Sequence, residues 1–217
     1  MTMIEITPAD ALIVVDIQND FCAGGALAVP DGDAVVPLVN RLARQFGVVV
    51  LTQDWHTLGH ASFASTHGRG PFQTIDLAYG PQVLWPDHCV MGTSGAAFHP
   101  GLDVPGAQMI VRKGFHPAVD SYSAFVEADH ATKTGLAGYL AERAVGRLFV
   151  VGLATDFCVN WTALDGRVAG FDVTVIEDAC RGIDLDGSLE RAWRDMATAG
   201  VRRCGSQELA FVVSLPD

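Results

Sequence analysis

One cysteine in this chain stands where nucleophilic chemistry is expected. The apolar, β-branched run 148–151 predicts a buried strand, and from Asp156 to about Ala169 apolar residues recur at three- and four-residue steps, which predicts a helix. The apolar residues of this helix are Phe157, Trp161, Leu164 and Val168. Cys158 falls in its first turn, where unpaired amides and the helix dipole favour a thiolate and could hold an oxyanion. A free cysteine is also a common small core residue, so its position alone leaves both roles open.

Two charged residues could assist such a thiol. The apolar run 11–15 ends at Asp16, and the run 109–111 is followed by Lys113 after one further residue. A carboxylate could take the thiol proton, with burial raising its pKa and a nearby lysine lowering it. We interpret Asp16, Lys113 and Cys158 as one unit with shared protons. Each alone could instead be a loop-capping aspartate or a solvated lysine.

A second group of residues has the composition of a metal site. Asp54 and His56 follow the apolar run 48–52, and their spacing of two lets both side chains point the same way. Carboxylate oxygen and imidazole nitrogen suit zinc, manganese or iron. His60 and His88 are further candidate ligands, and His60 is the least certain of the four. We interpret the other histidines as core or surface residues: His67, His99, His116 and His130.

Aromatic residues flank both groups. Phe21 follows the Asp16 loop and Trp85 precedes His88. Their rings could sandwich a flat substrate, or they could simply pack the loops.

The elements that must position these residues alternate in type along the chain. Buried strands are expected at about 11–15, 48–52, 109–111, 148–151, 173–176 and 201–204, and helices at about 34–46, 134–144, 156–169 and 186–199. This alternation predicts a single α/β domain over residues 1–217 with a mostly parallel sheet. Residues 57–107, rich in Gly, Pro, His and aromatics, form a long excursion of the kind that often carries function. Because ligands bind at the carboxyl ends of parallel strands, the candidate residues are expected in one crevice.

Composition excludes several classes of protein. The net charge is −11 over 217 residues without a cluster of Lys or Arg, which argues against a nucleic-acid partner. No apolar run approaches about 18 residues, and no signal-like segment is seen, so we expect neither a membrane span nor secretion. Five cysteines without a Cys-x-x-Cys pair indicate neither a disulfide framework nor a structural zinc site, and suit the cytoplasm. The composition is compatible with a homo-oligomer.

Five segments resemble motifs of one enzyme family, in the same order along nearly the whole chain. They are 14–21, 52–56 with His60, 85–90, 113–114 with 120–125, and 152–159. The first and last are similar to motifs of the isochorismatase-like cysteine hydrolases. The two histidine segments resemble those of the family's amidases that act on nicotinamide. This resemblance implies a three-layer fold with a six-stranded, mainly parallel sheet.

The resemblance also implies a reaction. Cys158 would attack the carboxamide carbon with Asp16 as base and Lys113 as its partner, ammonia would leave, and water would hydrolyse the thioester to nicotinate, a step of NAD salvage. Backbone amides of Ala154, after a cis Leu153–Ala154 peptide, and of Cys158 would hold the oxyanion. The remaining implied roles are metal binding by Asp54, His56 and His88, with His60 open, and ring stacking by Phe21 and Trp85. Pyrazinamide is expected as a further substrate.

Three other interpretations are weighed against this one. A metal-free cysteine hydrolase of the same family, acting on another small amide or carbamoyl compound, has no need of Asp54, His56 and His88. A non-catalytic metal-binding scaffold has no need of Asp16, Lys113 and Cys158. An isochorismatase proper lacks the cysteine.

Overall fold

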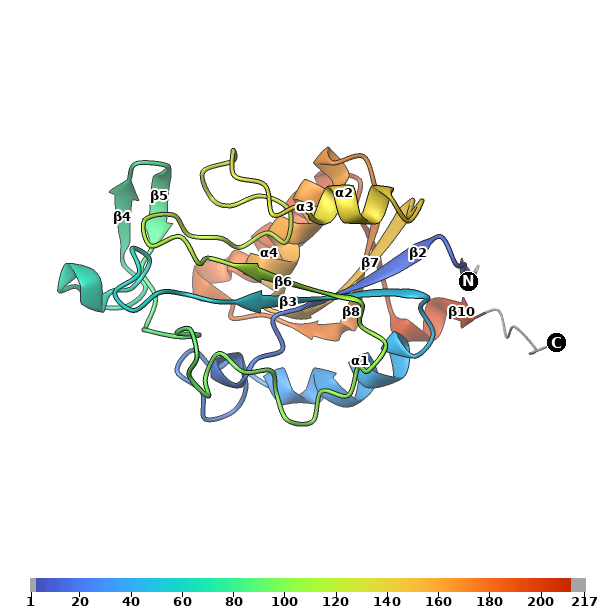
Figure 1. Cartoon of the computed structure of the whole chain (residues 1–217), viewed down its shortest axis with the longest axis horizontal. Coiled ribbons are helices and arrows are strands. Elements are labelled where there is room, and N and C mark those ends of the chain that lie inside the picture. The colour runs from blue at the N-terminus through green and yellow to red at the C-terminus, as the bar shows by residue number, and fades with distance from the viewer. Residues whose placement is uncertain (1–2, 212–217) are drawn as a thin grey trace.

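A parallel sheet lies between two layers of helices in the computed structural model, which describes residues 3–211 (Figure 1). Its six strands run in the order β6-β3-β2-β7-β8-β9, and every neighbouring pair is parallel. The strands are β2 (Asp10–Val15), β3 (Val48–Asp54), β6 (Met109–Lys113), β7 (Arg147–Leu153), β8 (Asp172–Arg181) and β9 (Arg202–Cys204). All six strands expected from the sequence are confirmed, as is the α/β class.

Within the described part of the chain, four α-helices cover the sheet. They are α1 (Val36–Ala43), α2 (Leu136–Ala141), α3 (Asn160–Val168) and α4 (Ser188–Thr198). Helix α1 packs on one face and the other three on the opposite face. The central strand β2 alternates between the two cores: Leu12 and Val14 face α1, whereas Ile13 and Val15 face the other layer. Buried on both faces, β2 is therefore apolar throughout, as parallel strands usually are.

Smaller elements complete the chain. The sequence did not predict β1 (Ile4–Ile6), which pairs in parallel with β10 (Leu209–Phe211), or the antiparallel hairpin of β4 (Thr74–Leu77) and β5 (Gly80–Val83). Single helical turns are η1 (Asn19–Phe21), η2 (Gly32–Val35), η3 (Ser65–His67), η4 (Thr155–Val159), η5 (Leu185–Gly187) and η6 (Ser206–Glu208). Strands of three or four residues are too short for a reliable period of two.

Helix α3 follows the expected cysteine region but buries a different face from the apolar stripe. Val168, on that stripe, is 87% exposed, whereas Thr162 and Ala163 are fully buried. A Cβ added to Gly166 would lie 3.1 Å from a methyl of Val173. Helix α3 can approach the sheet this closely because the residues between them are small. Small residues add little to a hydrophobic pattern, so the sequence did not predict which face of the helix is buried.

The carboxyl ends of the strands place the candidate residues at one edge of the sheet. Asp54 and Lys113 are the last residues of β3 and β6 and lie side by side in the register. Asp16 directly follows β2, and Cys158 lies in the turn η4 that follows β7. The excursion 57–107 carries the β4–β5 hairpin and then returns, because a parallel bridge joins His56 to Val90. Within residues 3–211, no helix has both the length and the apolar character that crossing a bilayer requires.

Gly152→Ala tests how tightly the two central strands pack beside this edge. Gly152 has φ +116°, and a Cβ there would lie 2.1 Å from the carbonyl oxygen of Val15. We expect the variant to lose about 3 kcal/mol or more of its free energy of unfolding, measured in urea. Gly138→Ala is the control, because its added methyl meets no atom within 4 Å, and we expect it to gain up to about 1 kcal/mol. Equal stabilities for the two variants would contradict the close approach.

Candidate active site

A fully buried lysine connects the residues that the strand ends bring together. Lys113 Nζ lies 2.8 Å from Asp16 Oδ2 and 3.3 Å from Cys158 Sγ, and it also pairs with Asp54 Oδ1. Its remaining partner is the carbonyl oxygen of Ser121 at 3.2 Å. Burial lowers the pKa of Lys113, but the two carboxylates outweigh burial and hold the pKa well above its usual value. The lysine is therefore a permanent buried cation.

Asp16 has the electrostatic environment of a base. Thr52 Oγ1 donates a hydrogen bond to its Oδ1 at 2.6 Å, which orients the carboxylate. Burial raises the pKa of Asp16 above its usual value, although Lys113 and Thr52 act in the opposite direction. A carboxylate with a raised pKa accepts a proton more efficiently near neutral pH than an ordinary aspartate does.

The surroundings of Cys158 favour the neutral thiol over the thiolate. Its Sγ lies within 4.8 Å of a carboxylate oxygen of Asp16, and the residue is only 6% exposed. Burial raises the pKa of Cys158 well above that of a free cysteine, and Lys113 opposes this only in part. The expectation of an acidic thiol, based on the start of a helix, is therefore wrong, because burial and the carboxylates of Asp16 and Asp54 outweigh Lys113. The thiol needs the base beside it.

The turn around Cys158 shapes the floor of the site. Residues Thr155–Val159 form one turn of π-helix before α3, and the amides of Phe157 and Val159 both donate to the carbonyl of Ala154 at 3.1 Å. The Leu153–Ala154 peptide is cis, as the resemblance implied. Ala154 and Cys158 both line the pocket, so this turn borders it.

Asp54, His56 and His88 converge beside this unit with the donor set of a metal site. His56 Nε2 and His88 Nε2 lie 3.7 and 3.8 Å from Asp54 Oδ2. The Nδ1 atom of each histidine lies 2.9 or 2.8 Å from a backbone carbonyl, of Gly114 and Pro86 respectively. A carbonyl only accepts, so Nδ1 carries the proton and the lone pair of Nε2 points at the common centre. The three residues therefore fit a divalent ion.

The charges of this trio also suit a cation. Burial, followed by the neighbouring His56, lowers the pKa of His88 to about 4 and keeps its ring neutral. Burial lowers the pKa of His56 too, but Asp54 outweighs burial and raises it. Burial raises the pKa of Asp54, yet Lys113 and the two histidines together bring it below its usual value. Asp54 is thus an anion shared between the lysine and the metal-type centre.

His60 lies beside the trio but presents no free nitrogen to it. Its ring is 4.5 Å from that of His56, centroid to centroid. Its Nε2 contacts the carbonyl oxygens of His116 and Val119 at 2.9 and 3.2 Å, and its Nδ1 accepts from the amide of Ser62 at 3.2 Å. Its ligation of a metal stays a prediction, one that requires these bonds to be exchanged.

An aromatic pocket opens over both groups and encloses about 330 Å³ of space, including its mouth. Phe21 and Trp85 line it, as predicted from the sequence. Trp85 packs edge-on against Phe157 with centroids 4.8 Å apart, and its Nε1 donates to Tyr122 Oη at 2.9 Å. The other lining residues are Leu27, Asp54, His56, His88, Asp120, Tyr122, Ala154, Phe157, Cys158 and Ile183.

Two residues that support the site were not predicted from the sequence. Gln18 is fully buried; its Oε1 accepts from the amide of Asp54 at 2.8 Å and its Nε2 donates to the carbonyl of Asp54 at 2.9 Å. Asp20 Oδ2 accepts from the amide of Cys89 at 2.7 Å, which holds the backbone next to His88. Both lie just beyond a buried strand, and polar residues at that position are the signal that could have identified them.

Comparisons with known proteins agree with this geometry. The model of the isochorismatase domain matches residues 10–208. A nicotinamidase of Acinetobacter baylyi is 57% identical over 200 residues, which cover 92% of this chain and 94% of that protein.

Solved structures with the same fold include complexes with small ligands. A nicotinamidase/pyrazinamidase of Acinetobacter baumanii superposes with a TM-score of 0.93 at 59% identity, covering 94% of this chain and 99% of that one. The PnC1 protein of L. infantum in complex with nicotinate gives 0.85 at 39% identity, covering 96% and 98%. A pyrazinamidase of Pyrococcus horikoshii in complex with zinc gives 0.75 at 38% identity, covering 91% and 99%.

One conclusion follows from the strand order, from the convergence of Asp16, Lys113 and Cys158, and from the extent of these matches. The chain belongs to the isochorismatase family.

Proposed function

We propose that this chain hydrolyses nicotinamide to nicotinate and ammonia through a thioester on Cys158. The observation that carries the proposal is the contact of buried Lys113 with Asp16, Asp54 and Cys158 at the floor of an aromatic pocket. The similarity to a nicotinamidase at 57% identity supports the same substrate. By the same similarities, pyrazinamide is a further substrate and the reaction belongs to NAD salvage.

In the proposed reaction Asp16 takes the proton of Cys158 as Sγ attacks the carboxamide carbon. The resulting oxyanion lies next to the backbone amides of Ala154 and Cys158. When the C–N bond breaks, Asp16 returns the proton to the departing ammonia. Asp16 then takes a proton from the water that attacks the thioester, and the protonated thiol and nicotinate are formed. Lys113 remains charged throughout and balances the negative charge that moves between Asp16 and Cys158.

The substrate ring is held by the walls of the pocket. Phe21 and Trp85 line this pocket, and we propose that they contact the faces of the ring. We propose Asp54, His56 and His88 as ligands of one divalent ion, and zinc as that ion because the donors are nitrogen and oxygen and a similar pyrazinamidase was solved with zinc. A bound ion would supply a Lewis-acidic position for the nitrogen of the pyridine ring.

The cysteines are consistent with a cytoplasmic enzyme. All five are free and buried, and none is paired in a disulfide. A reducing compartment preserves a nucleophilic thiol and is where we propose the protein acts.

Ammonia release from nicotinamide tests the proposal directly. We expect release by the purified chain and a fall of at least about 1,000-fold in kcat for Cys158→Ala, because the covalent route is lost. Cys204→Ala is the matched control, since Cys204 is also buried but does not line the pocket. Equal rates for the two variants, or no release by a metal-loaded chain, would reject nicotinamide hydrolysis by this site.

Metal content tests the role of the histidine trio. We expect His88→Ala to lose the ion of this trio, measured by elemental analysis as one equivalent fewer than in the unchanged chain, and to raise KM for nicotinamide by roughly 10-fold or more. His130→Ala is the control, because His130 stacks on Trp161 and belongs to none of the metal-type groups of donors in the described residues. An unchanged ion content in His88→Ala would remove that residue from the metal site.

The pH dependence tests Asp16 as the base. The carboxylate must be ionised to accept a proton, so kcat/KM is expected to fall as the pH decreases through the raised pKa of Asp16. Thr52→Val removes a hydrogen bond that favours the ionised form, and should therefore move this acid limb to higher pH by about one unit. Thr174→Val, near the amino end of β8 and so at the edge of the sheet opposite the site, should leave the limb in place. An acid limb unmoved by Thr52→Val would assign it to another group.

A further inference from the structure

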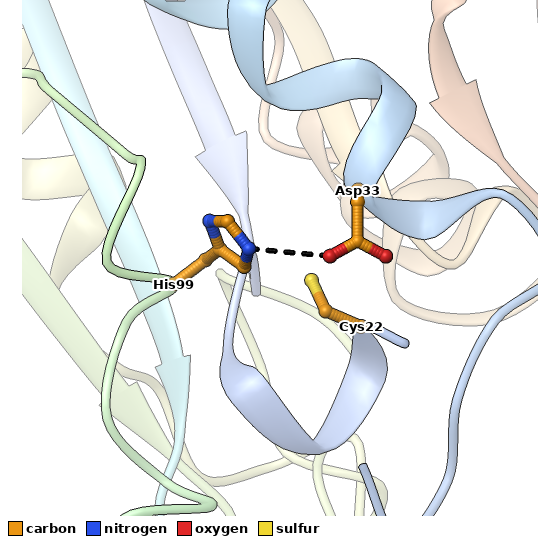
Figure 2. Close-up of side chains that lie close together, drawn as sticks. All are labelled: Cys22, Asp33 and His99. Carbon is orange, nitrogen blue, oxygen red and sulfur yellow. Dashed lines mark ion pairs between the residues drawn. The ribbon is translucent and has the colours of Figure 1, made fainter. Parts of the chain in front are cut away.

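A second cluster of metal-type donors lies outside the active-site pocket. Cys22, Asp33 and His99 come from three separate segments, and one ligand atom of each lies within 4.8 Å of the other two. Figure 2 shows their side chains directed toward a common point, with His99 Nε2 3.2 Å from Asp33 Oδ1. Cys22 directly follows η1, whose last residue, Phe21, lines the substrate pocket.

The carboxylate and the imidazole are held in place by the backbone. The amide of Ala23 donates to Asp33 Oδ2 at 2.8 Å, which leaves Oδ1 facing the histidine. The backbone of His99 donates to the carbonyl of Ile17 at 2.9 Å, and its Nδ1 accepts from the amide of Gly101 at 3.0 Å. A Cβ at Gly101 would lie 3.2 Å from the imidazole ring, so the lack of a side chain there allows the backbone to approach the ring. Held orientations of this kind lower the cost of assembling a binding site.

The arrangement differs from a cysteine–histidine–aspartate relay. In such a relay one ring nitrogen faces the nucleophile and the other faces the carboxylate. Here Nε2 of His99 faces Asp33, while Nδ1 is already taken by the amide of Gly101. The thiol, the carboxylate and one ring nitrogen all converge on a single point. This geometry fits metal coordination better than it fits a proton relay.

The cluster is accessible from solvent and carries the charge that a cation needs. Cys22 is buried, but the side chains of His99 and Asp33 are 23% and 42% exposed, and all three border an open hollow that Asp20 also lines. Thiolate and carboxylate together neutralise a divalent ion. Ligands of a tetrahedral zinc lie about 3.3 to 3.8 Å apart, so only a small contraction of the three atoms is required.

We propose that Cys22 Sγ, Asp33 Oδ1 and His99 Nε2 bind one thiol-preferring divalent cation of the zinc type, with water completing its coordination. On binding, the Cys22 thiol releases its proton to solvent. The proton of His99 moves from Nε2 to Nδ1, and the amide of Gly101 turns from the ring to water. This second ion ties the segment that bears Phe21 to the loop that bears His99, and so stiffens one wall of the substrate pocket.

A cation is needed for this thiol to ionise near neutral pH. Burial and the adjacent Asp33 raise the pKa of Cys22 to about 11. A bound ion therefore leaves a clear signature, because it forms a metal–thiolate bond where the free protein has a protonated thiol.

Cobalt titration of the metal-free full-length chain tests the proposal. We expect two equivalents of tightly bound cobalt and a thiolate-to-cobalt charge-transfer absorption in the near ultraviolet. Cys22→Ser should bind one equivalent and lose the absorption. Cys204→Ser, which changes a buried cysteine outside the cluster, should keep both.

The outcome is independent of the proposed amidase. His88→Ala should lose the other equivalent of cobalt yet keep the charge-transfer absorption, so the two sites are scored separately. His99→Gln, at a more exposed position, should also lose one equivalent of cobalt and the charge-transfer absorption. This variant takes the place of Cys22→Ser if Cys22→Ser does not fold. An absorption that is absent from the wild type, or that persists with equal cobalt content in Cys22→Ser and His99→Gln, would overturn the second site.

Discussion

The ion pairs of Lys113 with Asp16 and Asp54 are the interaction on which the rest of the site depends. A buried ammonium group without partners would cost several kcal/mol, and two buried carboxylates without it would repel each other. Together the three form a fixed arrangement of charge at the carboxyl edge of the sheet. The thiol of Cys158 lies against these three charges. The same lysine therefore influences the protonation of both Cys158 and Asp16.

The same lysine connects the nucleophile to the metal-type centre. Asp54 contacts Lys113 through one carboxylate oxygen and faces His56 and His88 through the other. Gln18 holds the backbone of Asp54 at both its amide and its carbonyl, which fixes where the carboxylate points. A change in the charge of either group would therefore be felt in the other, although the two groups have different chemical tasks.

The histidines show how backbone contacts decide what a side chain can do. His56 and His88 each direct Nδ1 at a carbonyl oxygen, which frees Nε2 for a ligand. His60 directs Nε2 itself at carbonyls and is left without a free lone pair toward the same centre. His99 accepts an amide hydrogen at Nδ1 and must exchange that bond before its Nε2 can bind a cation. Residue type is the same in all four, and the groups around each ring distinguish them, with Ser62 Oγ also contacting His60 and Asp33 also contacting His99.

The sequence by itself determined the six strands, the α/β class and the candidate residues at the strand ends, because apolar runs and the residues that follow them are local features. Only the tertiary structure decided which face α3 buries, since Gly166 approaches the sheet more closely than its hydrophobicity indicates. It also decided that burial raises the pKa of Cys158, and that Cys22 and His99 lie together. Burial, protonation and convergence depend on atoms contributed by distant segments, and no local pattern in the chain encodes them.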